Sequence, residues 1–511
     1  MRPVHLVPAG VVLLAFAAIG AVAQLDHPTA AAIPAATATH QAAVTSAVRA
    51  CPPALGGGAG TVALIAEPAR SGGSGQAELT SLPPVGVQLR AAGAISAAGP
   101  AGLSLLTVPA ASSVTKKGTA EPTAWSVTAS GTMAQAMEAE VAQSSGLASL
   151  RCGEPGSNLW FVGPGQQNGA AQIQLDLMNV DSLAASVDIS MITDAGPIQA
   201  GDDTGITVPP HQTVIESLSS AAGSSSVVAI EVHTSSGRVA ADVSEGSSHG
   251  KTTSWLPGAA APGTQLVIPG VPPSSHAAEL FLAVPGTSDA KVNVLAITPQ
   301  GQYRPFGSQA VDLPGESASS MALTPLGGTA AALEITSNVP VTATVLVPGS
   351  GVGSFTTVTA PITEQAVVAG NTSGSGFAAS VVLSAVTGPA RIRLSEISAP
   401  AAKGAKGSSV KGAKGSTAKG TSATQASASA SQVVSVKAGR TLVVPVKAPP
   451  GTKGGTPFAI VITPLAGSGP VYAARVETHD QSTVVSIIPA ASALTTISLL
   501  PVRDSYDAVS P

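Results

Sequence analysis

Residues 246–250 come closest to a catalytic motif, because Gly-Ser-Ser-His-Gly fits the G-x-S-x-G spacing of serine hydrolases. That chemistry needs a strained turn between a strand and a helix, which exposes the serine above an α/β sheet. Here the five residues follow an expected β-hairpin, lie in Ser- and Gly-rich sequence and precede no helical pattern. The match therefore predicts no nucleophile.

Metal and cofactor sites are equally hard to find in the sequence. The histidines lack the spacing of zinc ligands, and no glycine-rich phosphate-binding unit lies between a strand and a helix. They include His211, His233, His249, His276 and His479. We therefore expect a protein that is not an enzyme, with no catalytic residue, no cofactor and no metal site.

Six aspartates lie within residues 176–203, with no lysine or arginine among them. Extracellular β-modules sometimes bind calcium through such oxygens, but the spacing is that of neither an EF-hand nor a Gly-Asp repeat. We expect a solvated polar face instead. The six are Asp176, Asp181, Asp188, Asp194, Asp202 and Asp203.

The elements that must position these residues are β-strands. Apolar residues occupy alternate positions from Leu159 to Val243, as at Ile173, Leu175 and Leu177, and successive side chains of a strand leave opposite faces. The composition agrees, since 44% of residues are hydrophobic but only 3% are aromatic. Alanine and valine thus carry the apolar content, among many glycines and prolines that favour turns.

Short strands with frequent turn signals predict an all-β fold of tandem immunoglobulin-like β-sandwich repeats. A β-propeller built of four-stranded blades is the alternative. The pattern of Ile173 to Leu177 returns at Leu280, Leu282 and Val284, which indicates an internal repeat. Residues 133–143 fit a helix or a strand equally well.

These patterns predict the following divisions of the chain: 1–23, a signal peptide or membrane anchor; 24–50, a flexible stalk; 51–152, an N-terminal β-domain closed by a disulfide; 153–250 and 251–350, the first and second β-repeats; 351–503, a third repeat with a disordered Lys-Gly insert at 401–431; and 504–511, a tail.

The N-terminus carries the features of an export signal. Arg2 precedes an apolar run from Leu6 to Ala23, which ends Ala-Val-Ala. A positive start, an apolar centre and a small-x-small end predict cleavage after Ala23, although the run is also long enough for an uncleaved membrane anchor. In either case we expect the rest of the chain outside the cytoplasm, secreted or anchored to the plasma membrane.

The two cysteines, Cys51 and Cys152, are an even count in a chain expected to be exported. They predict a disulfide, and two unrelated free thiols are the alternative. Chain entropy gives an upper figure of about 4–5 kcal/mol for such a cross-link.

A Lys-Gly pattern without acidic residues lies in the insert. It could tether the chain to anionic wall polymer or lipid headgroups, but a disordered solubilising loop is the expected state. The net charge of −4 argues against nucleic acid as a partner. The lysines are Lys403, Lys406, Lys411, Lys414 and Lys419.

Four segments in this order resemble an uncharacterised family of exported proteins from Actinobacteria, known only as a domain of unknown function. They are Cys51-Pro52-Pro53, residues 152–163 (Cys-Gly-Glu-Pro-Gly-Ser-Asn-Leu-Trp-Phe-Val-Gly), Ser236–Val239 and Ser254–Gly258. The resemblance covers nearly the whole chain except the Lys-Gly insert. It implies an envelope location, and it supplies neither a ligand nor a catalytic residue.

The sequence as a whole therefore predicts a non-catalytic exported protein of the cell envelope, acting in adhesion, scaffolding or envelope assembly. Cell-wall polymer or envelope proteins are the expected partners, and the membrane is a partner if the N-terminal segment is retained. An extracytoplasmic enzyme acting on cell-wall glycan is the alternative. Its carboxylates would have to meet in a deep pocket.

Overall fold

The described part of the protein consists mostly of antiparallel β-strands, which confirms the predicted all-β class. The computed structural model describes residues 40–499, with gaps at 66–74, 86–94, 107–112 and 399–429 and gaps of five residues or fewer elsewhere. Among these residues the α-helix is a single turn, α2 (Ser219–Ala222). Among the described residues, 43–496 form one compact unit, and 40–42 with 497–499 belong to a second.

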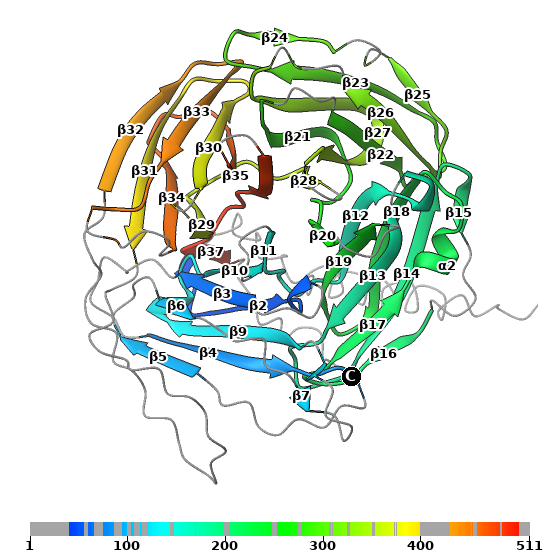
Figure 1. The fold of residues 1–511 in the computed structure, drawn as a ribbon, viewed down its shortest axis with the longest axis horizontal. Coiled ribbons are helices and arrows are strands. Elements are labelled where there is room, and N and C mark those ends of the chain that lie inside the picture. Colours follow the sequence, from blue (N-terminus) through cyan, green and yellow to red (C-terminus); the bar gives the residue numbers. More distant parts are fainter. Residues whose placement is uncertain are drawn as a thin grey trace, which may run out of the picture. The chain divides into compact units, whose positions relative to one another are not determined.

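The plan of the compact unit is clearest in the second sheet pair, which comprises β12 to β20 (Figure 1). One sheet has the order β12 (Asn158–Pro164), β18 (Val227–Ser236), β14 (Ala185–Thr193) and β15 (Gly196–Ile198), with β16 (Ile206–Val208) also on β14. The other has the order β17 (Thr213–Ser217), β13 (Ala170–Met178), β19 (Ala240–Ser247) and β20 (Thr253–Leu256). Phe161 and Ile230 of the first sheet share a core with Leu175 and Val243 of the second.

The first sheet pair has the same order of strands. Its sheets are β2 (Ser46–Cys51), β9 (Ala124–Gly131), β4 (Gly75–Leu82) and β5 (Ile95–Gly99), and β6 (Ser104–Leu106), β3 (Gly60–Ile65), β10 (Glu138–Gln143) and β11 (Ser149–Arg151). Leu79 and Val127 of one sheet pack with Leu64 and Val141 of the other. Two short two-stranded sheets belong to none of the sheet pairs: β7 (Ser113–Val114) with β8 (Ala120–Glu121), and β1 (His40–Ala43) with β37 (Thr496–Leu499).

The third and fourth sheet pairs repeat this order. One sheet of the third pair contains β21 (Gly263–Val271), β27 (Ala331–Val347), β23 (Ala290–Ile297), β24 (Gln302–Tyr303) and β25 (Val311–Leu313). The facing sheet contains β26 (Ser317–Leu323), β22 (Ala278–Val284), the second half of β27 and β28 (Ser354–Thr357). One sheet of the fourth pair has the order β29 (Ala366–Asn371), β34 (Phe458–Pro464), β31 (Ala390–Ser398) and β32 (Ala430–Val436). The facing sheet has the order β33 (Arg440–Val446), β30 (Phe377–Ala385), β35 (Val471–His479) and β36 (Thr483–Pro489).

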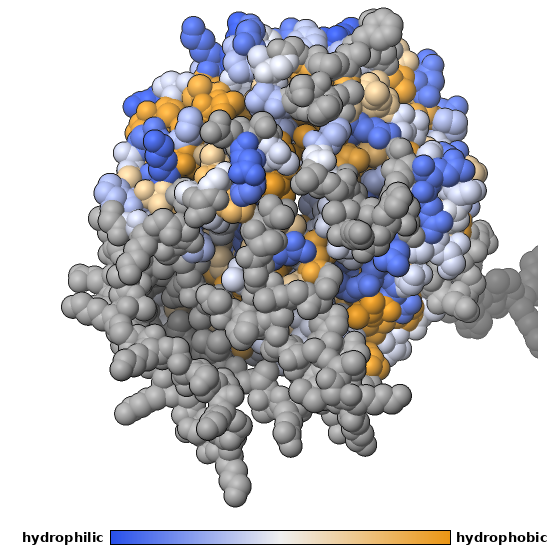
Figure 2. Space-filling model, in the orientation of Figure 1, coloured by the Kyte–Doolittle hydropathy of each residue, from blue (hydrophilic) through white to orange (hydrophobic). Residues whose placement is uncertain are grey.

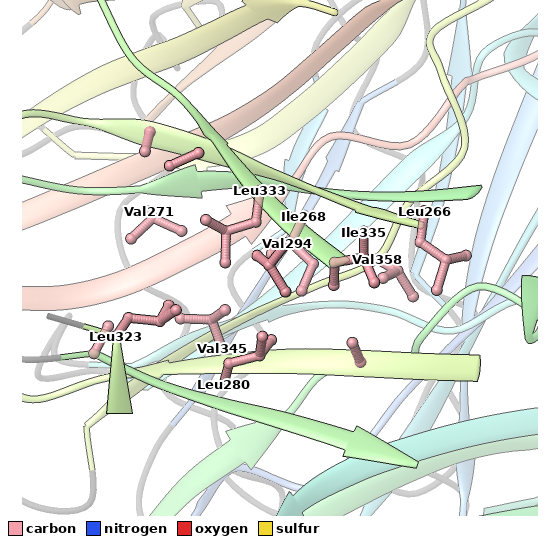
Figure 3. Packing of buried hydrophobic residues seen from close by; sticks show 14 of the residues in the cluster. Leu266, Ile268, Val271, Leu280, Val294, Leu323, Leu333, Ile335, Val345 and Val358 are labelled. Atoms are coloured by element: carbon pink, nitrogen blue, oxygen red, sulfur yellow. The ribbon is translucent and has the colours of Figure 1, made fainter. Parts of the chain in front are cut away.

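Alternation in the sequence decides which side chains enter each core. In β13 the alternate residues Ile173, Leu175 and Leu177 are buried in the core, as the period of two requires. Figure 3 shows the corresponding core of the third pair, where Leu280 and Val345 face Val294 and Leu333 of the opposite sheet. The segments that the sequence matched to one another thus occupy equivalent core positions.

One strand differs from its prediction in an informative way. Residues 331–336 and 341–347 read as two strands, whereas β27 runs unbroken through both. Its first half pairs with β21 and β23, and its second half pairs with β22 and β28. The chain therefore changes sheets here without a turn. In the second pair the equivalent strands, β18 and β19, are separate and are connected through Gly237; they lie in different sheets, so the β-hairpin expected there is wrong.

Small hydrophobic clusters join each sheet pair to the next. The first meets the second through Leu82 and Met178. The second meets the third through Val162 and Phe281, and the third meets the fourth through Ile297 and Val386. The fourth returns to the first where Val367 and Val461 pack on Ile65. The contacts of the compact unit therefore form a closed circuit.

Several predicted divisions change at their edges. β1 and the start of β2 lie inside the predicted flexible stalk 24–50, so that prediction is wrong for residues 40–43 and 46–50. The boundary at 250 falls before β20, which still belongs to the second pair, and the boundary at 350 falls before β28 of the third. The ambiguous stretch 133–143 is the strand β10 after a short 3₁₀ turn. The signal segment 1–23 and the tail 504–511 lie outside the described residues.

The disulfide between Cys51 and Cys152 is present, which confirms that prediction. Cys51 ends β2 and Cys152 follows β11, so the bond ties the two sheets of the first pair at one end of their shared core. Both cysteines are fully buried. The finer assignment, to tandem immunoglobulin-like sandwiches or to a propeller, stays a prediction.

The insert can be tested through the strands that flank it. β31 and β32 are hydrogen-bonded neighbours, with Glu396 opposite Ala430, so the chain leaves and re-enters at adjacent points. Replacing residues 399–429 with a short turn should preserve the fold and raise the free energy of unfolding by up to about 2 kcal/mol, because a shorter loop costs less closure entropy. Urea unfolding measures the change.

A matched variant keeps the length of the insert and replaces its five lysines with serine. Its stability should equal that of the natural chain, since the gain comes from loop length alone. Loss of soluble protein on shortening the insert would contradict the interpretation of this segment as a loop.

Candidate functional site

A pocket of about 400 Å³ lies inside the compact unit, among residues of several sheet pairs. Its lining includes residues 150–154, which end β11 and follow it, and Trp160 and Asp242 of the second pair. Residues 257–260 between β20 and β21 and residues 487–489 of β36 also contribute. A second hollow of about 440 Å³ shares Leu150, Pro257 and Ile487 with it. The volume is within the range of small-molecule sites.

Two buried aspartates stand side by side next to this pocket. Asp176 of β13 is the cross-strand partner of Asp242 of β19, and both point away from the core that Leu175 and Val243 enter. Their exposed fractions are 3% and 4%. The Gln174 side chain donates a hydrogen bond to Asp176 (2.9 Å), whereas Oδ2 of Asp242 has no partner among the described residues.

Burial controls the ionisation of this pair. Loss of solvent raises the pKa of Asp176 to about 6, against a smaller opposite effect of the Gln174 hydrogen bond. It also raises the pKa of Asp242 well above its usual range, and the neighbouring charge of Asp176 adds to this. Both carboxyls are therefore easier to protonate than an exposed aspartate.

A third buried carboxyl, Glu245, lies on the other face of β19. It is fully buried, and neither of its oxygens has a hydrogen-bond partner among the described residues. Burial raises its pKa well above the ordinary value, which favours the neutral acid. Gly163 of β12 faces it, and a Cβ at that position would lie 2.8 Å from Oε1. The absence of a side chain at residue 163 thus leaves room for the acid.

Glu138 of β10 holds two arginines at the edge of the pocket. Arg151 donates to both of its oxygens (2.7 and 2.6 Å), and Arg49 donates to one of them (3.1 Å). Burial would raise the pKa of Glu138, but the charges and hydrogen bonds of Arg151 and Arg49 outweigh it and hold the pKa below its usual range. Glu154 also pairs with Arg49 (2.7 Å). These charges therefore neutralise one another.

Arg475 of β35 is the centre of a second ionic cluster and is completely buried. Its guanidinium donates to Glu140 (2.7 Å), Glu477 (2.7 Å) and the Ser149 hydroxyl (2.8 Å). The backbone N–H of Gly370 donates a hydrogen bond to the other oxygen of Glu140 (2.8 Å). Glu140 and Ser149 belong to the first sheet pair and Arg475 to the fourth, so this cluster joins those two pairs.

Of the six aspartates in residues 176–203, the structure describes four, and three of these lie at the surface. Asp181 pairs with Arg238 (2.8 Å), Asp188 accepts from Gly205 N–H, and Asp194 accepts from the Ser226 hydroxyl. Asp176 is the exception, because it is buried. Asp202, Asp203 and residues 248–250 of the hydrolase-like motif lie outside the described residues. Within the described part of the chain, no group of three His, Cys, Asp or Glu residues could hold a metal ion.

A family of unknown function, DUF5719, matches residues 110–420. The chain belongs to this family. The match includes Glu138, Glu140, Asp176 and Asp242, whereas Arg475 lies beyond it. No curated protein and no solved structure matches the chain. The actinobacterial origin that the sequence resemblance implied stays a prediction. No helix among the described residues is long and apolar enough to cross a membrane.

Sequence reasoning missed Asp242, Glu140 and Arg475 as a group. A faint signal exists at Glu138-Ala139-Glu140-Val141, where acidic and apolar residues alternate along one strand. Alternation indicates a polar face, and a polar face is ordinarily solvated. The fourth pair covers Glu140 through Arg475 and Gly370, whereas Arg49 and Arg151 of the first pair cover Glu138.

The Arg475 cluster yields a stability prediction. Arg475→Met leaves Glu140 and Glu477 buried without their cation, which should lower the free energy of unfolding by about 3–5 kcal/mol. Urea unfolding of the purified chain measures the loss. The control is Lys291→Met, which breaks an exposed pair with Asp312 (3.5 Å) and should change stability little. Equal, small losses in both variants would show that Arg475 does not hold the sheet pairs together.

The pKa of Asp176 yields a pH prediction. Its folded pKa of about 6 exceeds the unfolded value of 3.8, so the folded state binds more protons between these values and stability falls as pH rises through that window. A shift of this size corresponds to about 3 kcal/mol at pH 7.5. Asp176→Asn should therefore stabilise the protein by up to that amount at pH 7.5, and the gain should shrink towards pH 4. Unfolding curves at both pH values test this, and a gain independent of pH would refute the assignment.

Proposed function

We propose that this protein is a non-catalytic, exported component of the cell envelope that acts as a rigid scaffold for adhesion or envelope assembly. The observation that carries the proposal is the closed circuit of contacts among the four sheet pairs, fixed by the buried Arg475 cluster. A unit fixed in this way holds its loops and sheet edges at constant spacing. That property suits a binding platform.

We also propose that the sheet pairs are copies of one β-sandwich unit. Each pair encloses its own core, and the strand order recurs in all four. Paired sheets around a shared core favour sandwiches over propeller blades, which are single sheets. The recurring order differs from the ABED and CFG order of the immunoglobulin constant type, so the proposal extends to the architecture and not to that topology.

The extracytoplasmic address rests on two features. The N-terminal segment carries an export pattern, and a buried disulfide is typical of oxidising compartments.

On the face shown in Figure 2, hydrophobic residues lie in separate groups among hydrophilic ones. Such a face suits polar contacts with wall polymer or envelope proteins better than insertion into lipid.

The buried carboxyl pair favours one alternative, an extracytoplasmic enzyme acting on cell-wall glycan. Glycan hydrolysis uses two carboxyls that flank the scissile bond, and Asp242 lines the pocket. Asp176 does not line the pocket, however, and the second carboxyl in the lining, Glu154, is paired with Arg49 at 2.7 Å. We therefore favour the scaffold.

Export and binding are tested together in an actinobacterial host. The complete chain should appear outside the cytoplasm with both cysteines oxidised, and the purified protein should co-sediment with cell-wall preparations without releasing reducing sugar. A control variant that lacks residues 1–23 should stay in the cytoplasm. A cytoplasmic full-length chain with free thiols would refute the proposed address. Release of sugar by the natural chain, abolished in Asp242→Asn, would establish the enzyme instead.

A further inference from the structure

The pocket beside Asp242 has an unbalanced charge. Asp242 lines the pocket and has an exposed fraction of only 4%. Its Oδ2 atom has no hydrogen-bond partner among the described residues. An unpaired polar atom in such a place loses its water contacts without compensation. A ligand that donates a hydrogen bond would supply the missing partner.

The cations near the pocket are already engaged. Arg151 also lines it, but two of its nitrogens are bound to Glu138 at 2.7 and 2.6 Å. The second arginine, Arg49, lies between Glu138 and Glu154. Two arginines thus balance two glutamates, whereas Asp242 and its neighbour Asp176 face no described cation. At pH values above the raised pKa of Asp242, the charge left unbalanced here is therefore negative.

The rest of the lining is largely apolar. Leu159, Phe161, Ala259 and Val358 contribute from three different segments, and Ile488 contributes from a fourth. A low-dielectric wall strengthens the attraction between a carboxylate and a cation. The same wall favours a ligand whose remaining atoms are hydrocarbon.

We propose that this pocket binds a small organic cation, in which an alkylammonium group contacts Asp242 and an apolar body fills the remaining space. The ammonium group supplies both the hydrogen-bond donor and the charge that the pocket lacks. Asp176 strengthens the attraction from the adjacent strand. This site is independent of the proposed scaffold role, because it needs neither export nor a wall polymer.

The test uses isothermal titration of the purified full chain with three probes of one shape: butylammonium, butan-1-ol and butyrate. At pH 8, butylammonium should bind with a dissociation constant below about 1 mM, and the neutral and anionic probes should bind at least about tenfold more weakly. Asp242→Asn keeps the side-chain shape, removes the charge and should abolish the preference for the cation. The matched control, Asp312→Asn, removes an exposed carboxylate of the third pair and should leave binding unchanged.

Thermal melting shows whether each variant is folded. If Asp242→Asn fails to fold, Asp176→Asn replaces it, and a loss of butylammonium affinity without a loss of butanol affinity is expected. The proposal is overturned if butylammonium does not bind, if butan-1-ol binds equally well, or if the folded Asp242→Asn variant keeps the preference for the cation.

Discussion

The burial of one guanidinium group constrains the rest of this structure. Arg475 has no solvent contact, and its charge is tolerated because Glu140 and Glu477 both lie at 2.7 Å. Burying such charges costs several kcal/mol each unless the geometry is good. Residues that are more than 300 positions apart must therefore be held in register. The cost of a misplaced partner makes the junction of the first and fourth sheet pairs specific, where apolar packing alone would tolerate small shifts.

Hydrophobic contacts between the sheet pairs stabilise their association, and the Arg475 cluster fixes the relative position of the first and fourth pairs. Alanine and valine dominate the clusters between sheet pairs, as at Ala63, Val367 and Val461. Small side chains allow sheets to approach closely, which explains how a chain with only 3% aromatic residues can bury many strands on both faces. In β22, for example, Leu280 enters the core of its own pair while Phe281 packs on the second pair. Short side chains also leave space unfilled where several segments meet, as in the pocket beside Asp242.

The family assignment describes the relatedness of the sequence, whereas the pocket describes the chemistry of individual residues. Membership in a family of unknown function identifies residues 110–420 as related to other chains, and it assigns no chemistry to them. The chemistry comes from position. Glu138 is neutralised by two arginines, whereas Asp242 has a carboxyl neighbour and an unpaired oxygen. A buried acidic residue is thus part of a structural ion pair in the case of Glu138 and part of a candidate binding site in the case of Asp242.

The sequence by itself determined the strands, their inward faces and the disulfide. Alternation at Ile173, Leu175 and Leu177 is a local property, and two cysteines allow only one intramolecular pairing. Tertiary structure alone decided the outward faces. The residues Glu140 and Asp176 alternate with apolar neighbours just as solvated residues do, and they are buried because another sheet pair or segment covers them. A period of two shows which side chains share a face of a strand, but it carries no information about what that face meets.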